Sequence, residues 1–159
     1  MDYLEAAKVL RGIPLFEKLD PAMLKLLAFA SSHLTFDDGE ALFHAGDAAD
    51  SVYLIDEGEA VILAEGEDHE VFVGTLGRHE MFGEMAIFMN SSRSATIKAK
   101  GTLKVIRIDG DMFLKLVTEN PDAALGVMRA LSVKIARAME SYEALEDKVR
   151  ALQQVDDTA

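Results

Sequence analysis

Glycines recur through the middle of the chain and divide it into short apolar segments. Eight of them lie between residues 34 and 109, at Gly39, Gly46, Gly58, Gly66, Gly74, Gly77, Gly83 and Gly101. Glycine is disfavoured inside helices and enriched at turns, so this spacing favours strands of roughly five to eight residues. Many short, evenly spaced strands are typical of an antiparallel sheet that closes or rolls up on itself.

Two pairs of apolar runs within this zone predict hairpins. Residues 52–55 and 60–63 flank a polar segment around Gly58, which we expect to be a turn. Residues 95–100 alternate small or apolar with polar side chains as far as Gly101, and 103–108 follow as a second run. Paired runs about a glycine turn are a hairpin signature.

Helical patterns flank the strand-rich zone. Asp20 precedes Pro21, and an aspartate cap followed by proline at the first helical position predicts a helix start. Residues 109–120 predict a short helix, and the chain restarts after Asn120-Pro121 into a helix expected to reach about Gln154. We therefore divide one domain into a sheet-containing part with N-terminal helices, residues 1–120, and a C-terminal helix with a short tail, residues 121–159.

Charge and composition exclude several classes of protein. The 159 residues carry 28 acidic and 16 basic side chains, a net charge of −12, so we expect no binding to DNA and none to acidic membranes. The absence of cysteine excludes disulfides, thiolate catalysis and cysteine zinc sites. The N-terminus lacks the basic start and apolar centre of a signal peptide, so we expect a cytoplasmic protein.

The segment 77–96 departs from the strand texture and carries the candidate chemistry. Gly83 before a short helical turn would let backbone amides approach an anion, and the carboxylate of Glu84 can accept a hydrogen bond from a hydroxyl. Nine residues later, Arg93 can supply a forked donor to phosphate oxygens. This combination suits a ligand that bears both a hydroxyl group and a single phosphate, such as a sugar phosphate or nucleotide.

Here the sequence resembles the cyclic nucleotide-binding domain family, which includes the catabolite activator protein and the regulatory subunits of cyclic-AMP-dependent protein kinase. The resemblance rests on Phe-Gly-Glu-Met-Ala at 82–86 and Arg-Ser-Ala-Thr at 93–96, which match the family's phosphate-binding cassette. It extends over about residues 10–150. It implies a mainly β fold, an eight-stranded antiparallel β-roll (double-stranded β-helix or jelly roll) with N-terminal helices and a long C-terminal helix.

The resemblance also implies roles for individual residues. Glu84 should bind the ribose 2′-hydroxyl, and Arg93 should pair with the cyclic phosphate. The other cassette positions expected to line the site are Phe82, Gly83, Met85, Ala86, Ser94 and Ala95. One departure precedes the cassette: where relatives have a turn rich in glycine and proline, this chain has Gly-Arg-His-Glu-Met at 77–81.

These residues also allow other interpretations. Glu84 and Arg93 would also be compatible with a structural ion pair that closes a loop. The four histidines are scattered without the spacing of metal ligands, so we expect no metal site. No serine lies in a glycine-framed elbow, and no nucleophile, base or metal constellation is present, so we expect no catalytic residues, no cofactor and no enzyme activity.

The expected function is a stand-alone sensor module for cyclic AMP, with cyclic GMP as the other candidate ligand. Ser94 is neither the alanine of kinase-type cyclic-AMP sites nor the threonine associated with cyclic GMP, but it resembles the cyclic-AMP-responsive activators. The alternatives are a sensor of another small ligand, such as a cyclic dinucleotide, and a dimerisation scaffold with a vestigial pocket. Because the sequence shows no output module, we expect the signal to pass to a separate, unidentified protein unless the chain is part of a longer one.

The C-terminal helix carries a heptad pattern that predicts a parallel homodimer. Its seam positions step by three and four and are all apolar or aromatic: Met128, Leu131, Ile135, Ala138, Tyr142, Leu145, Val149 and Leu152. Alignment with activator-type relatives places Tyr142 near the base-contacting turn of this helix. We therefore include Tyr142 among the expected ligand-binding residues, against the alternative that its hydroxyl merely reaches water at the edge of the seam.

Overall fold

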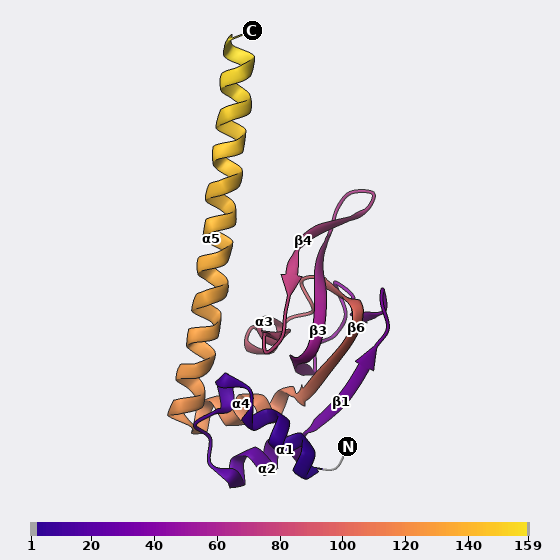
Figure 1. Ribbon diagram of the computed structural model, residues 1–159, viewed down its shortest axis with the longest axis vertical. Coiled ribbons are helices and arrows are strands. Elements are labelled where there is room, and N and C mark those ends of the chain that lie inside the picture. Colours follow the sequence, from indigo (N-terminus) through magenta and orange to yellow (C-terminus); the bar gives the residue numbers. More distant parts are fainter. Residues whose placement is uncertain (1–2, 159) are drawn as a thin grey trace.

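The computed structural model describes residues 3–158 and shows a mainly antiparallel sheet with helices at one end and a long C-terminal helix (Figure 1). The helices are α1 (Tyr3–Arg11), the 3-10 helix η1 (Pro14–Phe16), α2 (Pro21–Phe29), α3 (Glu84–Phe88), α4 (Gly110–Glu119) and α5 (Pro121–Thr158). The strands are β1 (Ser31–Phe36), β2 (Ala41–Phe43), β3 (Ser51–Glu65), β4 (Glu70–Leu76), β5 (Met81–Phe82) and β6 (Thr96–Asp109).

The predicted helix starts are confirmed by their caps. A carboxylate oxygen of Asp20 accepts a hydrogen bond from the amide of Met23 at 2.9 Å, at the start of α2. Asp109 caps α4 in the same way through the amide of Met112, at 3.1 Å. Each cap satisfies a backbone donor that the first helical turn leaves free. The predicted C-terminal helix is also present, and it continues through the first residues of the expected tail to Thr158, whereas Ala159 lies outside the described residues.

The strand count differs from the expectation, because the described residues form six strands rather than eight. The strand order is β1-β6-β3-β4, with β2 paired to β6 and β5 paired to β3. Neither predicted hairpin about Gly58 or Gly101 forms. Instead, β3 and β6 are long antiparallel strands that pair with each other from Ser51–Asp109 at one end to Leu63–Thr96 at the other.

Paired glycines explain why these strands bend without reversing. Gly58 and Gly101 have φ values of +95° and +71°, in the left-handed region that glycine adopts without steric cost. The β3–β6 register shifts on both sides of Glu57, beside Gly58. Both strands therefore change direction at about the same level and stay paired, as at a β-bulge. Sequence reasoning took each glycine for a chain reversal because the distant pairing partner was not visible.

Replacing Gly58 should cost more stability than replacing Gly101. A Cβ atom at Gly58 would collide with the carbonyl oxygen of Thr102, whereas a Cβ atom at Gly101 would have no heavy atom within 4 Å. Both changes to alanine carry the left-handed backbone cost of about 1–3 kcal/mol, and only Gly58→Ala adds the collision. Chemical denaturation should show a lower free energy of unfolding for Gly58→Ala than for Gly101→Ala. Equal losses in the two variants would contradict the paired bend.

Two hydrophobic clusters lie on opposite faces of one wall, which β3 and β6 form. Val52 and Leu54 of β3 pack with the helices, whereas Tyr53 and Ile55 between them pack on the other face of the sheet. In β6, Ile106 and Ile108 likewise join the helical cluster, while Leu103 and Val105 join the sheet cluster. Successive side chains of a strand point to opposite faces, so the uninterrupted apolar run at 52–55 reflects burial on both faces.

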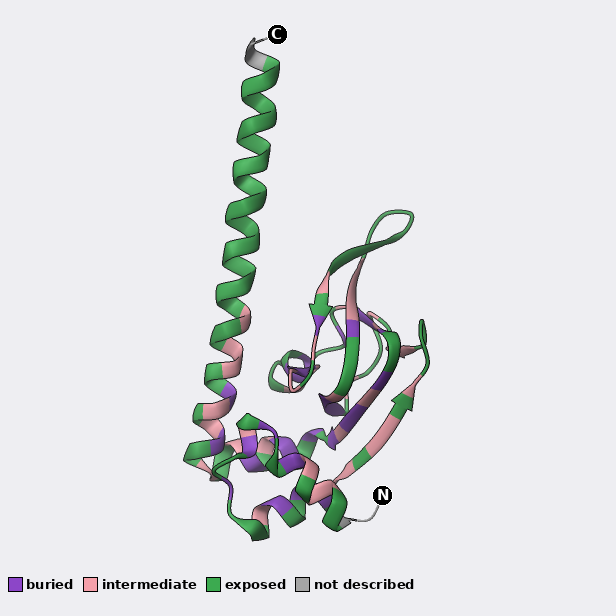
Figure 2. Cartoon of the chain, in the orientation of Figure 1, coloured by how far each residue is buried: buried purple, intermediate pink, exposed green. Residues whose placement is uncertain are grey.

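Helix α5 begins at the helical end of the molecule, runs alongside the sheet and extends well beyond the far end of the sheet (Figure 1). Its beginning packs on the helical cluster through Ala123 and Val127, which are 2% exposed. From residue 135 onward its described side chains are exposed (Figure 2). No helix among residues 3–158 is long and apolar enough to cross a membrane.

Candidate functional site

The segment from Gly83 to Arg93 is built around a close approach between these two residues. Gly83 caps α3 with a φ of +82°, so it needs the conformational freedom of glycine. A Cβ atom at this position would lie 2.6 Å from Nη1 of Arg93. Glycine is therefore required both for the turn into α3 and for the place that the arginine occupies.

Arg93 is buried and held from two sides. Its Nη1 donates to the carbonyl oxygen of Gly83 at 2.8 Å, and its Nη2 donates to the carbonyl oxygen of Ser51 at 2.7 Å. The guanidinium lies over the ring of Phe43, 4.2 Å from the centroid, an arrangement that favours a cation. Burial lowers the pKa of Arg93 from its ordinary value. The Nε atom is buried and has no hydrogen-bond partner.

A polar network behind Arg93 fixes its partner Ser51. The Ser51 hydroxyl accepts a hydrogen bond from Nε of Arg107 at 3.1 Å and donates one to Oδ1 of Asp50 at 3.1 Å. Arg107 also pairs with Asp50 at 3.0 Å, and this hydrogen bond lowers the pKa of the Asp50 carboxyl. Sequence reasoning missed Asp50, Ser51 and Arg107, because only the β3–β6 pairing brings them beside the cassette.

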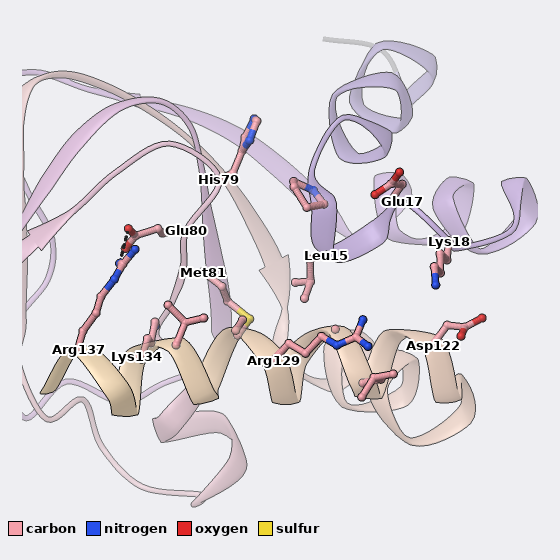
Figure 3. Close-up of a pocket in the computed structure, with 15 residues that line it drawn as sticks. Leu15, Glu17, Lys18, His79, Glu80, Met81, Asp122, Arg129, Lys134 and Arg137 are labelled. Carbon is pink, nitrogen blue, oxygen red and sulfur yellow. Dashed lines mark hydrogen bonds and ion pairs between the residues drawn. The ribbon is translucent and has the colours of Figure 1, made fainter. Parts of the chain in front are cut away.

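Glu84 is 2% exposed and is tied to α5 rather than to Arg93. Its Oε1 forms an ion pair with Nζ of Lys134 at 2.9 Å, while its Oε2 is buried without a hydrogen-bond partner. A second ion pair joins Arg137 of α5 to Glu80, just before β5, also at 2.9 Å (Figure 3). The structure therefore does not contain the Glu84–Arg93 ion pair that the sequence left open.

Glu84 and Arg93 line one cavity of about 570 Å³, within the range of ~300–1,000 Å³ that is typical of small-molecule sites. The cavity brings together eight of the predicted site residues: Phe82, Gly83, Glu84, Met85, Ala86, Arg93, Ser94 and Ala95. Helix α5 closes one side with Lys134, Arg137, Ala138 and Ser141, none of which the sequence identified as site residues. Strand β4 contributes apolar and small residues to the opposite wall.

Tyr142 is not brought into this cavity. Its side chain is 65% exposed and lies in a shallow hollow on α5 with Ile135, Ala138 and Met139. Ala138 borders both the hollow and the cavity, so the expected dimer seam passes the mouth of the site.

Two buried polar side-chain atoms without hydrogen-bond partners belong to residues that line this cavity. Buried polar atoms without partners are costly, and Glu84 Oε2 and Arg93 Nε are the two such side-chain atoms among the described residues. A carboxylate oxygen accepts a hydroxyl donor, and a guanidinium donates to an anion. No group of three or more histidine and acidic residues that could hold a metal ion occurs within residues 3–158.

Comparisons with known proteins identify the family of this chain. The family model for the cyclic nucleotide-binding domain matches residues 33–120. The cAMP-dependent protein kinase type II regulatory subunit of Drosophila melanogaster is 32% identical over 111 residues, which is 69% of this chain and 29% of that protein. The chain thus spans less than a third of the length of this curated relative.

Solved structures show the same fold. A cyclic nucleotide-binding-like protein from Brucella abortus is 31% identical, with a TM-score of 0.59, over 72% of this chain and 99% of that one. The catabolite activator protein of Thermus thermophilus is 24% identical, with a TM-score of 0.68, over 84% of this chain and 63% of that one. Both share the antiparallel sheet with flanking helices. On the family match over residues 33–120, this chain belongs to the cyclic nucleotide-binding domain family.

Proposed function

We propose that this domain binds cyclic AMP in the cavity between α3 and α5. Arg93 donates to the cyclic phosphate, and Glu84 accepts a hydrogen bond from the ribose 2′-hydroxyl. One observation carries the proposal: the buried, unpartnered Glu84 Oε2 and Arg93 Nε belong to residues that line the same cavity. The likeness to a cAMP-dependent kinase subunit supports cyclic AMP as the nucleotide.

Ligand binding would be signalled through the two ion pairs that tie α5 to the sheet. Lys134 occupies one oxygen of Glu84, the same carboxylate that we assign to the ribose. A ribose hydroxyl on this carboxylate changes the contacts of Lys134, and the Arg137–Glu80 pair lies one helical turn further along α5. We propose that nucleotide binding repacks α5 in this way and that a separate protein reads the change.

A thermal-shift screen with cyclic AMP, cyclic GMP and a cyclic dinucleotide tests the ligand. At 100 times its dissociation constant, a ligand stabilises the folded state by ~2.7 kcal/mol, which raises the melting temperature of a protein of this size by several degrees. We expect the largest rise with cyclic AMP. A larger rise with the dinucleotide would replace the nucleotide assignment, and no rise with any of the three would favour a scaffold with a vestigial pocket.

We further propose that two chains pair in parallel through α5. Beyond Leu131, which packs on the helical cluster, the large apolar side chains of the seam are 46–67% exposed. Among the described residues of α5, none beyond Leu131 belongs to either hydrophobic cluster, and a helix in a protein gains most of its stability from packing. A second copy of α5 supplies the matching surface, because the seam repeats every seven residues.

In such a dimer, Tyr142 contacts the base in the cavity of the partner rather than in its own. Tyr142→Ala should then weaken cyclic AMP binding by roughly 1–3 kcal/mol, the scale of base–aromatic stacking. Calorimetry at a protein concentration that keeps the dimer intact measures this loss. Unchanged nucleotide affinity with a weaker dimer would show that Tyr142 serves the seam alone.

A further inference from the structure

A second cavity, of about 460 Å³, lies between η1 and the first half of α5 (Figure 3). Its walls come from η1 and the two residues after it, from the segment before and into β5, and from one face of α5. It is separate from the nucleotide cavity, although Glu80, Lys134 and Arg137 border both. We call it the η1–α5 groove.

Gly126 allows η1 to approach α5 closely. A Cβ atom at this position would lie 3.2 Å from both the carbonyl oxygen and Cδ1 of Leu15. Leu15 therefore packs against the helix backbone and forms an apolar wall of the groove. Met81, which is 3% exposed, lines the groove from the sheet side.

Large apolar side chains remain open to solvent in this groove. Leu125 is 44% exposed and Val133 is 50% exposed, and both face the groove from α5. They are eight residues apart, which corresponds to ~12 Å along the helix at ~1.5 Å per residue. Apolar surface is therefore open to solvent on either side of the midpoint of this stretch of α5.

Two cations of the groove have no ion-pair partner among the described residues. Arg129 lies halfway between Leu125 and Val133 on α5, and Lys18 follows η1 on the opposite wall. Figure 3 shows the Lys18 ammonium group directed toward α5 and the Arg129 guanidinium extending along it. The other two cations, Lys134 and Arg137, are already paired with Glu84 and Glu80.

The acidic side chains of the groove are placed where they leave Arg129 and Lys18 unpaired. The Glu17 carboxylate is directed away from α5 (Figure 3). Asp122 lies in the first turn of α5, where a carboxylate complements the helix dipole. The middle of the groove thus presents a free guanidinium between two exposed apolar side chains.

We propose that the η1–α5 groove binds an amphipathic carboxylate, with its head group on Arg129 and Lys18 and its apolar chain along α5. A forked guanidinium matches a carboxylate, and Leu15, Leu125 and Val133 match a hydrocarbon chain. Because Arg129 lies ~6 Å along the helix from each of Leu125 and Val133, the first carbons of the chain cover one of the two, and Leu15 and Met81 line the groove for the rest of a chain of about eight to ten carbons. The groove shares Glu80, Lys134 and Arg137 with the nucleotide cavity, but the proposed head-group ligands Arg129 and Lys18 do not line that cavity.

Titration with decanoate below its micelle-forming concentration, followed by amide NMR, tests the site. We expect saturable binding of one decanoate per chain, with the largest shifts at Leu15, Lys18, Gly126 and Arg129. Arg129→Gln should weaken binding at least about tenfold, because it removes the charge-assisted hydrogen bonds. The matched control is Arg150→Gln, an exposed arginine of α5 outside the groove, which should bind decanoate as the parent does.

A further comparison tests the head group. The uncharged 1-decanol should bind at least about tenfold more weakly than decanoate. Equal binding of the alcohol, shifts confined to the α5 seam, or an unaffected Arg129→Gln variant would each overturn the proposal. None of these results depends on whether the nucleotide site is functional.

Discussion

Arg93→Ala is expected to abolish measurable cyclic AMP binding under conditions where the parent domain saturates. Removing one partner of a buried, charge-assisted contact costs about 2–5 kcal/mol, so the affinity should fall at least about 30-fold. The substitution also leaves the carbonyl oxygens of Gly83 and Ser51 without their donor, which should lower the free energy of unfolding by about 1–3 kcal/mol. Calorimetry measures the affinity, and thermal unfolding confirms that the variant is folded.

Two variants make this result specific. Arg78→Ala removes an exposed arginine that bonds only to the carbonyl oxygen of Asp56, so its cyclic AMP affinity should match that of the parent. Glu84→Gln keeps the size of the side chain but loses its charge, and it should weaken binding less than Arg93→Ala does. A folded Arg93→Ala variant that binds cyclic AMP as tightly as the parent would refute the cassette assignment.

The double substitution Leu145→Glu/Leu152→Glu should convert a dimer into a monomer. Both leucines are more than 60% exposed in the single chain and occupy seam positions. In a paired helix, each glutamate would be buried without a partner, at a cost of about 3 kcal/mol per charge. Light scattering at micromolar concentration should report twice the chain mass for the parent and 17.4 kDa for the variant.

Glu146→Gln is the matched control, because Glu146 is exposed on the same part of α5 but lies outside the seam. It should leave the dimer intact. The domain body makes its own core contacts upstream of residue 135, so the double variant should keep its thermal unfolding transition. A parent protein that already scatters as a monomer would rule out the α5 seam.

The cassette could be predicted from the sequence because its residues are neighbours along the chain. Gly83, Glu84 and Arg93 lie within eleven positions of one another, and a local turn is enough to direct them into one cavity. Lys134 was missed because no motif in the adjacent sequence identifies it as a site residue. It looks like a surface position of an amphipathic helix, and only the packing of α5 on η1 and α4 brings it to Glu84.

For the fold too, features set by neighbouring residues could be predicted, whereas features set by distant strand pairing could not. The Asp20 cap and the short helix over residues 109–120 depend on neighbouring residues, and both predictions were confirmed. The hairpins at Gly58 and Gly101 were wrong because the same glycine allows either a reversal or a bend. Which of the two occurs depends on pairing between β3 and β6, and this pairing joins residues more than thirty positions apart.

The wall that β3 and β6 share between the two hydrophobic clusters makes the domain a single cooperative folding unit. Because alternate residues of 52–55 belong to different clusters, neither cluster can open without removing the backbone support of the other. Amide protons of this wall should therefore exchange with solvent only through global unfolding. A ligand that binds beside the wall stabilises the whole domain. It therefore also slows amide exchange at residues whose side chains face the helices, and so protects residues that it never touches.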